Sequence, residues 1–486
     1  MQNNIRQKAV SGMAWTAIQK YSAMIIQFIS GIILARLLTP YDYGCIGMLT
    51  IFMVVSETFI DGGFGDALIQ KKRPSQEDYS TIFYWNLGMA TVLYVILYLS
   101  APLISKFYNI PLLCNVLRVQ GIILFIYAFN FVQRNQLRKS MNFRMLSIVT
   151  LATSIISISL TIIMAYKGFG VWSLVVQNIV TAFLTAIIFW FHLRWRPSFV
   201  FSKKSFHDLF GFGFYMFLTD LINKIGKEIQ GLLIGRFYNP TTMGLYSKAN
   251  STERLASTSI SQIMMQVTFP LYAEVQDDLR RLSNMVRQLT MSVSYLTFPL
   301  IFILILCAKP IFVLLYSERW LGSVPYFQIL CLSGLAYCMQ SVNHQSITAI
   351  GKSKLLFVWT FVKRLVGILF VVGGLLMAGM KGLLVGVVMN TWFSYAVNIG
   401  LVSKYVGYYW WKQLKDIAPI FVVCSIAFII SCLSTSIWHV HLYVEGLLKS
   451  AIFSLIYLGW TLVCKPEASR NINNIIASFL KKKINK

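Results

Sequence analysis

Apolar segments long enough to cross a membrane follow one another from Ala14 to Cys464, separated by short polar connections. A membrane-spanning helix needs about twenty mostly apolar residues. Charged residues make up 12% of the chain and hydrophobic residues 57%, which leaves too little polar surface for a water-exposed fold. The sequence therefore predicts an all-α, polytopic membrane protein with about fourteen transmembrane helices.

The predicted helices lie near 14–37, 43–65, 79–104, 114–133, 145–166, 169–192, 209–235, 245–272, 286–308, 322–349, 355–378, 382–403, 417–437 and 446–464. Alternate connections hold most of the 43 Lys and Arg residues, and we assign Lys363 and Arg364 to one of them. Because cytoplasmic connections carry the excess of cations, this alternation places both termini in the cytoplasm. We expect the protein in the cytoplasmic (inner) membrane of a bacterium.

Several classes of function are disfavoured by the same pattern. The net charge of +26 is distributed over short connections rather than gathered on a soluble face, so no nucleic acid partner is expected. The eight cysteines are scattered without ligand spacing, which predicts no metal site. The connections are too short for a catalytic domain, and no GxxxxGK[ST] motif occurs. We therefore predict a transporter without a cofactor, not an enzyme.

Two short sequences resemble each other at a constant offset of 200 residues. ILARLLTPYDYG ends at Gly44 and LIGRFYNPTTMG ends at Gly244, so that the Arg, Pro and Gly residues align. A Lys-Gly pair also recurs, at 167–168 and 381–382. Two six-helix halves in the same orientation would produce both similarities, and parallel repeats are a transporter architecture. The alternatives are chance and a local role, in which Arg binds the last carbonyls of a helix, Pro ends it and Gly permits a tight turn.

This repeat predicts four parts of the chain. Residues 1–208 form an N-lobe and 209–404 a C-lobe, which are pseudo-symmetric, and 405–464 hold two further helices. Residues 465–486 form a basic tail with apolar residues at helical spacing. The tail is either an amphipathic helix on the inner leaflet or a frayed basic end.

Ionisable residues inside predicted helices are the candidate functional residues, because each costs on the order of 3 kcal/mol on insertion scales. They lie on the first, second, seventh and eighth helices: Lys20, Glu57, Asp61, Asp220, Lys224, Lys227, Glu228, Glu253 and Arg254. These helices form equivalent pairs in the proposed repeat, so their polar faces are expected to meet in a water-filled cavity. Alternatively, carboxylates one turn away neutralise Lys224, and Lys20 reaches the inner surface.

Four segments resemble the Wzx-type polysaccharide exporters, in the branch of colanic-acid and lipopolysaccharide exporters. They are ILARLLTPYDYGCIGM at 33–48, GDALIQKK at 65–72, LLIGRFYNPTTMGLYSKA at 232–249 and FPLYAEV at 269–275. The resemblance covers nearly the whole chain and extends to the superfamily of lipid II flippases and multidrug (MATE) exporters. It implies fourteen helices in two six-helix lobes plus two, with a V-shaped alternating-access cavity. It also implies that an undecaprenyl-diphosphate-linked oligosaccharide is flipped from the inner to the outer leaflet, with polysaccharide polymerase machinery as a candidate partner.

A diphosphate crossing the membrane needs cations to replace its hydration. The candidates are Lys20, Lys224, Lys227 and Arg254, although members of the family often have arginines where this chain mostly has lysines. The candidate sites for coupling to H⁺ or Na⁺ are the carboxylates Glu57, Asp61, Asp220, Glu228 and Glu253. The alternatives are a MATE-like exporter of small molecules or drugs, which favours an acidic cavity, and a membrane glycan polymerase, which needs a large outside loop.

Overall fold

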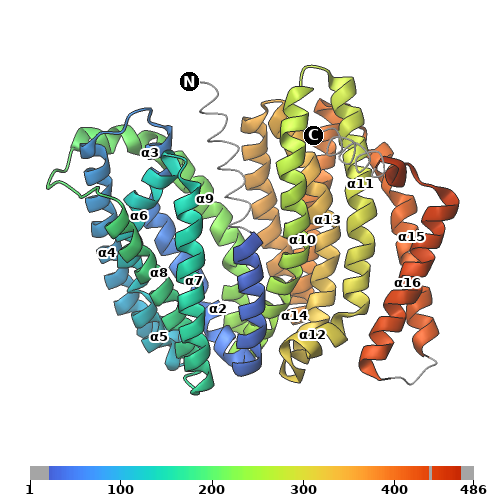
Figure 1. Ribbon diagram of the computed structural model, residues 1–486, viewed down its shortest axis with the longest axis horizontal. Coiled ribbons are helices and arrows are strands. Elements are labelled where there is room, and N and C mark those ends of the chain that lie inside the picture. Colours follow the sequence, from blue (N-terminus) through green and yellow to red (C-terminus); the bar gives the residue numbers. More distant parts are fainter. Residues whose placement is uncertain (1–20, 437–440, 472–486) are drawn as a thin grey trace. The chain divides into compact units, whose positions relative to one another are not determined.

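A computed structural model of the chain describes residues 21–436 and 441–471, and every regular element in these ranges is a helix (Figure 1). The predicted all-α fold is confirmed. Within the described residues, ten helical stretches are long and apolar enough to cross a membrane. The N-terminal residues through Lys20 and the tail from Ile472 lie outside the described residues, so the predicted tail helix is not tested.

The longest helix, α14 (Ser353–Tyr405), is two helices joined by a sharp reversal. Ala378 and Gly379 leave the helical backbone conformation inside it. A Cβ built on Gly374 would overlap the carbonyl of Gly382, and a Cβ on Gly382 would overlap the carbonyl of Gly374. The two limbs therefore run side by side and antiparallel, as predicted for the helices near 355–378 and 382–403. The total of fourteen crossings remains a prediction.

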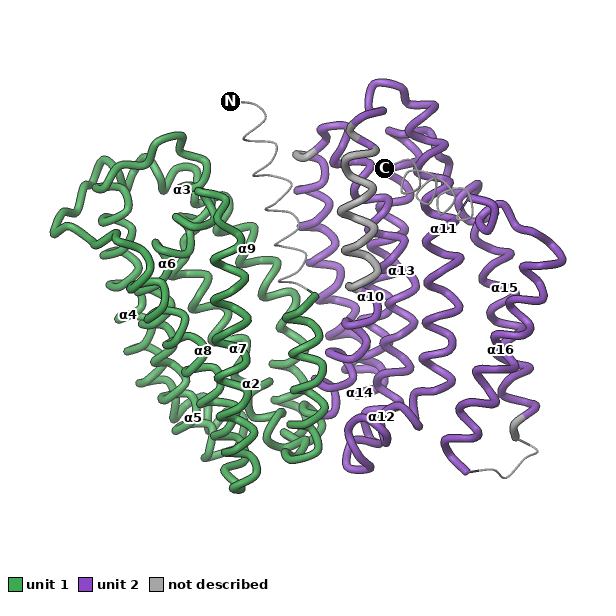
Figure 2. Tube along the Cα trace, in the orientation of Figure 1, with its two compact units in different colours: residues 1–244 green, residues 245–486 purple. Residues whose placement is uncertain are grey.

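The chain forms two compact units, Met1–Gly244 and Leu245–Lys486 (Figure 2). After a helical segment at Tyr21–Leu37, the first unit contains α2 (Pro40–Asp61), α3 (Phe64–Gln70), α4 (Gln76–Tyr108), α5 (Leu112–Gln120), α6 (Ile123–Lys139), α7 (Phe143–Tyr166), α8 (Val171–His192) and α9 (Lys203–Phe237). Helix α9 belongs to this unit because it packs along α2, α3 and α4. The lobes predicted at 1–208 and 209–404 are defined by a sequence repeat, whereas the two units are defined by their compactness. The lobes therefore remain a prediction.

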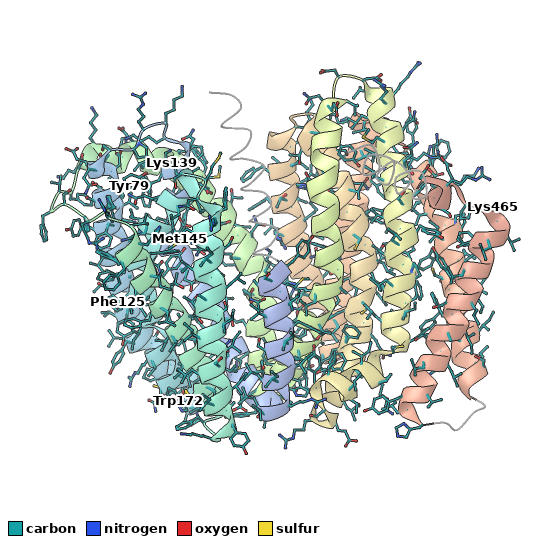
Figure 3. All side chains as sticks on the ribbon, in the orientation of Figure 1. Tyr79, Phe125, Lys139, Met145, Trp172 and Lys465 are labelled. Atoms are coloured by element: carbon teal, nitrogen blue, oxygen red, sulfur yellow. The ribbon has the colours of Figure 1, made fainter. Side chains whose placement is uncertain are left out.

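One end of the first unit is organised by Lys139, the last residue of α6. Its ammonium group donates to the carbonyls of Leu68 and Ile69, at 3.0 and 2.8 Å, and to that of Lys71. A lysine at the end of a helix satisfies carbonyls that lack partners within the helix. Lys139 therefore fixes the C-terminus of α3. Figure 3 shows Lys139 and Tyr79 near this end of the unit and Trp172 near the other.

The second unit contains α10 (Pro240–Glu274), which begins in the first, followed by α11 (Leu279–Leu306), α12 (Ala308–Tyr316), a 3₁₀ turn η1 (Glu318–Ser323), α13 (Val324–Ala349), α14, α15 (Trp410–Ser436) and α16 (Leu442–Cys464). Helix α13 packs against both α11 and α14. A buried apolar cluster joins these three helices at one end and includes Val286, Val342 and Val402. The two C-terminal helices pack on each other and on α11.

Arg287 of α11 holds the two C-terminal helices in place. Its guanidinium donates to both carboxylate oxygens of Asp416 on α15, at 2.7 and 3.1 Å. It also donates to both carboxylate oxygens of Glu467, just beyond α16, at 2.8 and 2.7 Å. Tyr408, whose pKa is raised by burial, donates to Asp416 at 2.8 Å. Paired bidentate bonds of this kind fix both distance and orientation.

The predicted repeat at Gly44 and Gly244 has the same local structure in both copies. Pro40 opens α2 and Pro240 opens α10, and in each case two residues separate the proline from the end of the preceding helix. A side chain caps each start: Thr39 forms a capping box with Asp42, and Asn239 accepts from the backbone of Thr242 at 2.8 Å. Proline at the first helical position suits this geometry because its missing N–H needs no partner there.

The glycines of the repeat serve a purpose different from the predicted tight turn. Both lie in the second turn of a helix, where a Cβ on Gly44 would overlap the carbonyl of Pro240. Reciprocally, a Cβ on Gly244 would overlap the carbonyl of Pro40. The first turns of α2 and α10 therefore cross in backbone contact, and each copy of the repeat supplies the glycine that accommodates the proline of the other.

The Lys-Gly similarity is not structurally equivalent. Gly168 lies in the turn between α7 and α8 with a φ of 83°. Gly382 lies beyond the reversal of α14, in a helical stretch that packs on Gly374. The first glycine supplies a left-handed backbone conformation and the second supplies close packing, so the two glycines differ in structural role although each lies near a reversal between two helices.

Gly44→Ala and Gly244→Ala are each expected to lower stability by about 2 kcal/mol or more, because the added methyl group meets a backbone carbonyl that cannot rotate away. The midpoint of thermal unfolding in detergent measures this effect. Gly88→Ala, in α4, is the matched control, because nothing lies within 4 Å of its Cβ position. Equal midpoints for all three variants would show that the crossing is not tight.

Candidate functional site

Four of the predicted residues gather in the first unit, on α2 and α9. The ammonium of Lys224 lies 3.2 Å from the carboxylate of Asp220, one helical turn away. Glu57 is close enough to Lys224 and Arg134 to interact electrostatically, and Asp61 to Lys224 and Asp220. The side chains of Lys224 and Asp220 remain 34% and 58% exposed. The ion pair is therefore accessible and does not lock Lys224 into a dry interface.

The backbone next to this cluster brings α2 close to α9. Helix α2 ends at Gly62 and Gly63, both in the left-handed conformation. A Cβ on Gly63 would overlap the carbonyl of Gly213 on α9. Asp61 accepts a hydrogen bond from the backbone of Gly65 at 3.1 Å and so caps the start of α3. Part of the role of Asp61 is thus to hold the helix break that places Glu57 beside α9.

The remaining predicted residues of α9 lie further along the helix. Lys227 is exposed and Glu228 is half-buried. They lie three and four residues after Lys224 on α9, so all three side chains lie on neighbouring parts of one helix face. Lys20 lies outside the described residues, so its predicted place in a cavity is not tested.

A second charged cluster lies in the second unit, where α10 meets α13. Glu253 is buried, with 6% exposure, and is hydrogen-bonded to Ser257 one turn away. Its carboxylate packs against Gly334 of α13, where a Cβ would come within 2.8 Å of one oxygen. Arg254, the next residue, is exposed and interacts electrostatically with Tyr337 of α13. The predicted pair Glu253 and Arg254 thus divides into a buried acid and an accessible base.

Sequence reasoning misplaced two cations of this cluster, Lys363 and Arg364, in an inside connection. Both lie inside α14, ten residues beyond its start at Ser353, which is about 15 Å along the helix axis. Arg364 is close enough to Arg254 for the two guanidinium charges to repel each other. The signal was available in WTFVKRLVGIL, where two cations interrupt a long apolar run.

Lys363 differs from Arg364 in its surroundings. It is 7% exposed, and its ammonium donates to the side-chain oxygen of Asn398, on the second limb of α14, at 2.9 Å. The amide of Asn398 in turn donates to the carbonyl of Gln340 on α13 at 3.4 Å. Lys363 therefore joins three helical stretches, whereas its neighbour Arg364 is half-buried.

The two clusters favour different chemistry. In the first unit, acids and bases are near balance, with Glu57, Asp61 and Asp220 facing Lys224 and Arg134. In the second, the bases Arg254, Lys363 and Arg364 outnumber the acid Glu253. Two guanidinium groups that repel each other at membrane depth are stabilised by an anion between them. No group of three metal-ligating side chains occurs among the described residues.

Comparison with known proteins gives a consistent picture. The family model described as "Polysaccharide biosynthesis protein" matches residues 33–325. The chain is 26% identical to the teichuronic acid biosynthesis protein TuaB of Bacillus subtilis, over 83% of this chain and 82% of that protein. It is 23% identical to the lipopolysaccharide biosynthesis protein WzxC of Escherichia coli, over 82% of each. The lipid II flippase MurJ in an inward closed conformation has a TM-score of 0.72 at 15% identity, covering 92% of this chain and 98% of that one.

Lys363 is buried and Lys224 is accessible. Removing the partner of Lys363 is therefore expected to lower the stability of the protein more than removing the partner of Lys224. Asn398→Leu is expected to destabilise the protein by about 2 kcal/mol, because a buried ammonium loses its acceptor. Asp220→Asn is expected to change stability by less than about 1 kcal/mol, because its ion pair is exposed. Thermal unfolding in detergent compares the two variants. Lys363→Met in the Asn398→Leu background should recover much of the loss, and no recovery would contradict the assignment.

Proposed function

The chain belongs to the polysaccharide biosynthesis protein family, and we propose that it is a flippase for lipid-linked oligosaccharides. It moves an undecaprenyl-diphosphate-linked unit from the inner to the outer leaflet by alternating access, for assembly of a surface polysaccharide. The relatives named for teichuronic acid and lipopolysaccharide biosynthesis support this substrate class. The fold shared with a lipid II flippase supports transport rather than catalysis.

The observation that carries the proposal is the proximity of Arg254 on α10 and Arg364 on α14 in the second unit. A diphosphate carries about two negative charges, and it loses its hydration on entering a low-dielectric region. Guanidinium groups are suited to phosphate because their planar donors bind two oxygens at once. Arg254 and Arg364 therefore bind the diphosphate in the proposal. Lys224 and Lys227 are the candidate phosphate-binding cations of the first unit.

In this proposal, the carboxylates of the first unit couple transport to the binding of a proton or a sodium ion. Glu57 and Asp61 lie beside Lys224, so that binding a proton or a sodium ion changes the balance of charge around that lysine. A carrier takes up its ion on one side of the membrane and its substrate on the other. The balance of charge at its coupling site must therefore differ between its inward-facing and outward-facing states. Glu253, Asp220 and Glu228 are further carboxylates for this role, and Asp220 is the most exposed of the three.

The protein acts in the bacterial cytoplasmic membrane, with both termini in the cytoplasm and polysaccharide polymerase machinery as a partner, according to the proposal. The excess of Lys and Arg in alternate connections supports this orientation. The cation-capped end of the first unit, where Lys139 binds the end of α3, then faces the cytoplasm.

A small-molecule exporter is the alternative, and one observation favours it: the first-unit cluster contains the carboxylates Glu57, Asp61 and Asp220. Carboxylates in an accessible site suit cationic drugs better than a diphosphate. In that case neutralising the second-unit arginines would leave surface polysaccharide intact, and the first-unit acids would control resistance to cationic compounds.

Arg254→Gln combined with Arg364→Gln is expected to reduce surface polysaccharide at least tenfold, because removing two charge-assisted contacts costs about 3 kcal/mol. The measurement is polysaccharide at the surface of cells that depend on this protein, together with its level in the membrane. Lipid-linked precursor should accumulate on the cytoplasmic side.

The matched control is Lys106→Gln combined with Lys381→Gln, which removes the same charge from exposed positions at the predicted outer side. Normal polysaccharide in the arginine variant, at normal protein level, would refute the proposed substrate site. An equal loss in the control would show that total charge matters rather than position.

Glu57→Gln combined with Asp61→Asn is expected to make flipping insensitive to an imposed proton or sodium gradient, because neither side chain then changes charge. Asn at 61 retains an oxygen that accepts from Gly65, so the start of α3 stays capped. Flipping of a fluorescent lipid-linked oligosaccharide in proteoliposomes, with and without each gradient, measures this. A gradient response equal to that of the unchanged protein would place the coupling elsewhere.

A further inference from the structure

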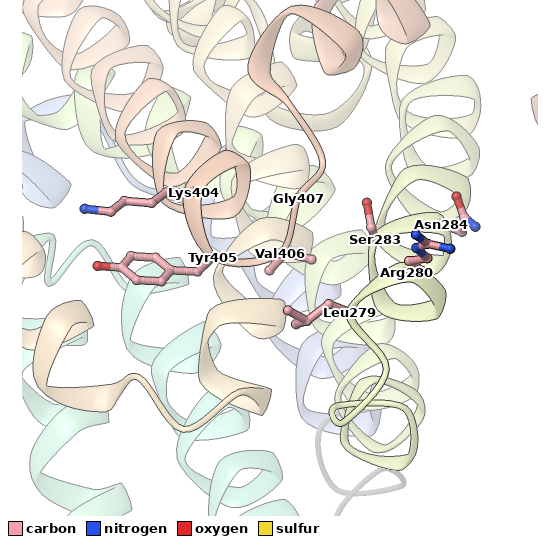
Figure 4. Close-up of a pocket in the computed structure, with 8 residues that line it drawn as sticks. All are labelled: Leu279, Arg280, Ser283, Asn284, Lys404, Tyr405, Val406 and Gly407. Carbon is pink, nitrogen blue, oxygen red and sulfur yellow. The ribbon is translucent and has the colours of Figure 1, made fainter.

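A pocket outside both charged clusters lies in the second unit, where α11 begins and α14 ends. It has a volume of about 450 Å³ and is lined by Leu279, Arg280, Ser283, Asn284, Lys404, Tyr405, Val406 and Gly407. Figure 4 shows Leu279 and Val406 in the middle, Lys404 and Tyr405 extending to one side, and Arg280 and Asn284 on the other. The pocket thus has an apolar floor between two polar flanks, each of which carries a cation.

The pocket lies at the level where two membrane spans end. The span in α11 starts at Leu279, and the span in α14 ends at Tyr405. Leu279 is 51% exposed, although it is apolar. Lipid headgroups occupy this level of a bilayer, directly beyond the hydrocarbon core. An exposed leucine next to two cations therefore suits a single lipid molecule, in which the glycerol and acyl chains are apolar and the phosphate is anionic.

Aromatic and cationic residues near the pocket also support its position at the headgroup level of the bilayer. The ammonium groups of Lys352 and Lys404 lie 5.5 and 5.4 Å from the centre of the Tyr405 ring. The following residues Tyr409, Trp410 and Trp411 are each at least 55% exposed. Tyrosine and tryptophan gather where a membrane meets water. Three cations and a belt of aromatic residues thus surround one surface pocket on the predicted cytoplasmic side.

We propose that this pocket binds the phosphate headgroup of an anionic phospholipid of the inner leaflet. Arg280 and Lys404 bind the phosphate from the two flanks, while Leu279 and Val406 contact the glycerol and the upper acyl chains. None of the eight lining residues is acidic. Basic pockets between transmembrane helices on the cytoplasmic side are suited to anionic headgroups.

The side chains, rather than the start of α11, supply the binding. The carboxylate of Asp278 accepts from the backbone N–H groups of Arg280 and Arg281, both at 3.1 Å. The second and third backbone donors of α11 are therefore already satisfied, and in the proposal a phosphate depends on the flanking cations. This dependence makes the pocket separable from the diphosphate site, because neither Arg280 nor Lys404 belongs to the clusters of Glu57 or Glu253.

The test uses the full chain purified from mixed phosphatidylcholine and phosphatidylglycerol vesicles, with retained lipid measured by native mass spectrometry. The unchanged protein should retain phosphatidylglycerol in preference to phosphatidylcholine. Arg280→Gln combined with Lys404→Gln should weaken this retention about tenfold, since each cation near the surface contributes to attraction of an anionic lipid. Both side chains are exposed, so the variant is expected to fold.

The matched control is Arg281→Gln combined with Lys412→Gln, which removes equal charge from exposed residues that do not line the pocket. Retention near that of the unchanged protein supports the pocket, and a loss equal to that of the pocket variant overturns it. Soluble pyrophosphate is a further arm. If it displaces the phosphatidylglycerol, the pocket recognises a diphosphate rather than a lipid, and the proposal fails. The assay needs no transport, so its result is independent of the flippase proposal.

Discussion

A charge at membrane depth costs on the order of 3 kcal/mol, and this constraint organises both units of the protein. Each unit meets it with neighbours from other helices. In the first, Lys224 has Asp220 on its own helix and Glu57 on α2. In the second, Lys363 is satisfied by Asn398 across the hairpin of α14. The helices thus pack in an arrangement that lets these charges find partners.

The length of the apolar segments predicted the helices well, because a span cannot be much shorter than the hydrocarbon core. The prediction of 79–104 corresponds to α4, and 355–378 with 382–403 corresponds to the two limbs of α14. The ends were less accurate, since caps such as Ser75 with Asp78 extend a helix beyond its apolar part. The break at Gly62 and Gly63 lies inside the predicted helix 43–65, although a Gly-Gly pair is itself a turn signal.

The candidate residues were predicted one helix at a time. This procedure predicts pairs of residues within a helix but not pairs that form between two helices. Spacing placed Asp220 and Lys224 on one face of one helix, and the structure pairs them. The neighbourhood of Arg254 and Arg364 depends on how α10 meets α14, which no local spacing encodes. Counting Lys363 and Arg364 as loop cations had hidden them. As a result, sequence reasoning emphasised the lysines of α9, whereas the excess of cations lies in the second unit.

The crossing of α2 and α10 restricts the sequence at two positions that are far apart in the chain. At Gly44 the obstacle to a larger side chain is the carbonyl of Pro240, and at Gly244 it is the carbonyl of Pro40. A smaller side chain nearby cannot make room, because each carbonyl belongs to the main chain. The two glycines are therefore required together, and a polypeptide that ended before Pro240 would lack the segment against which Gly44 packs.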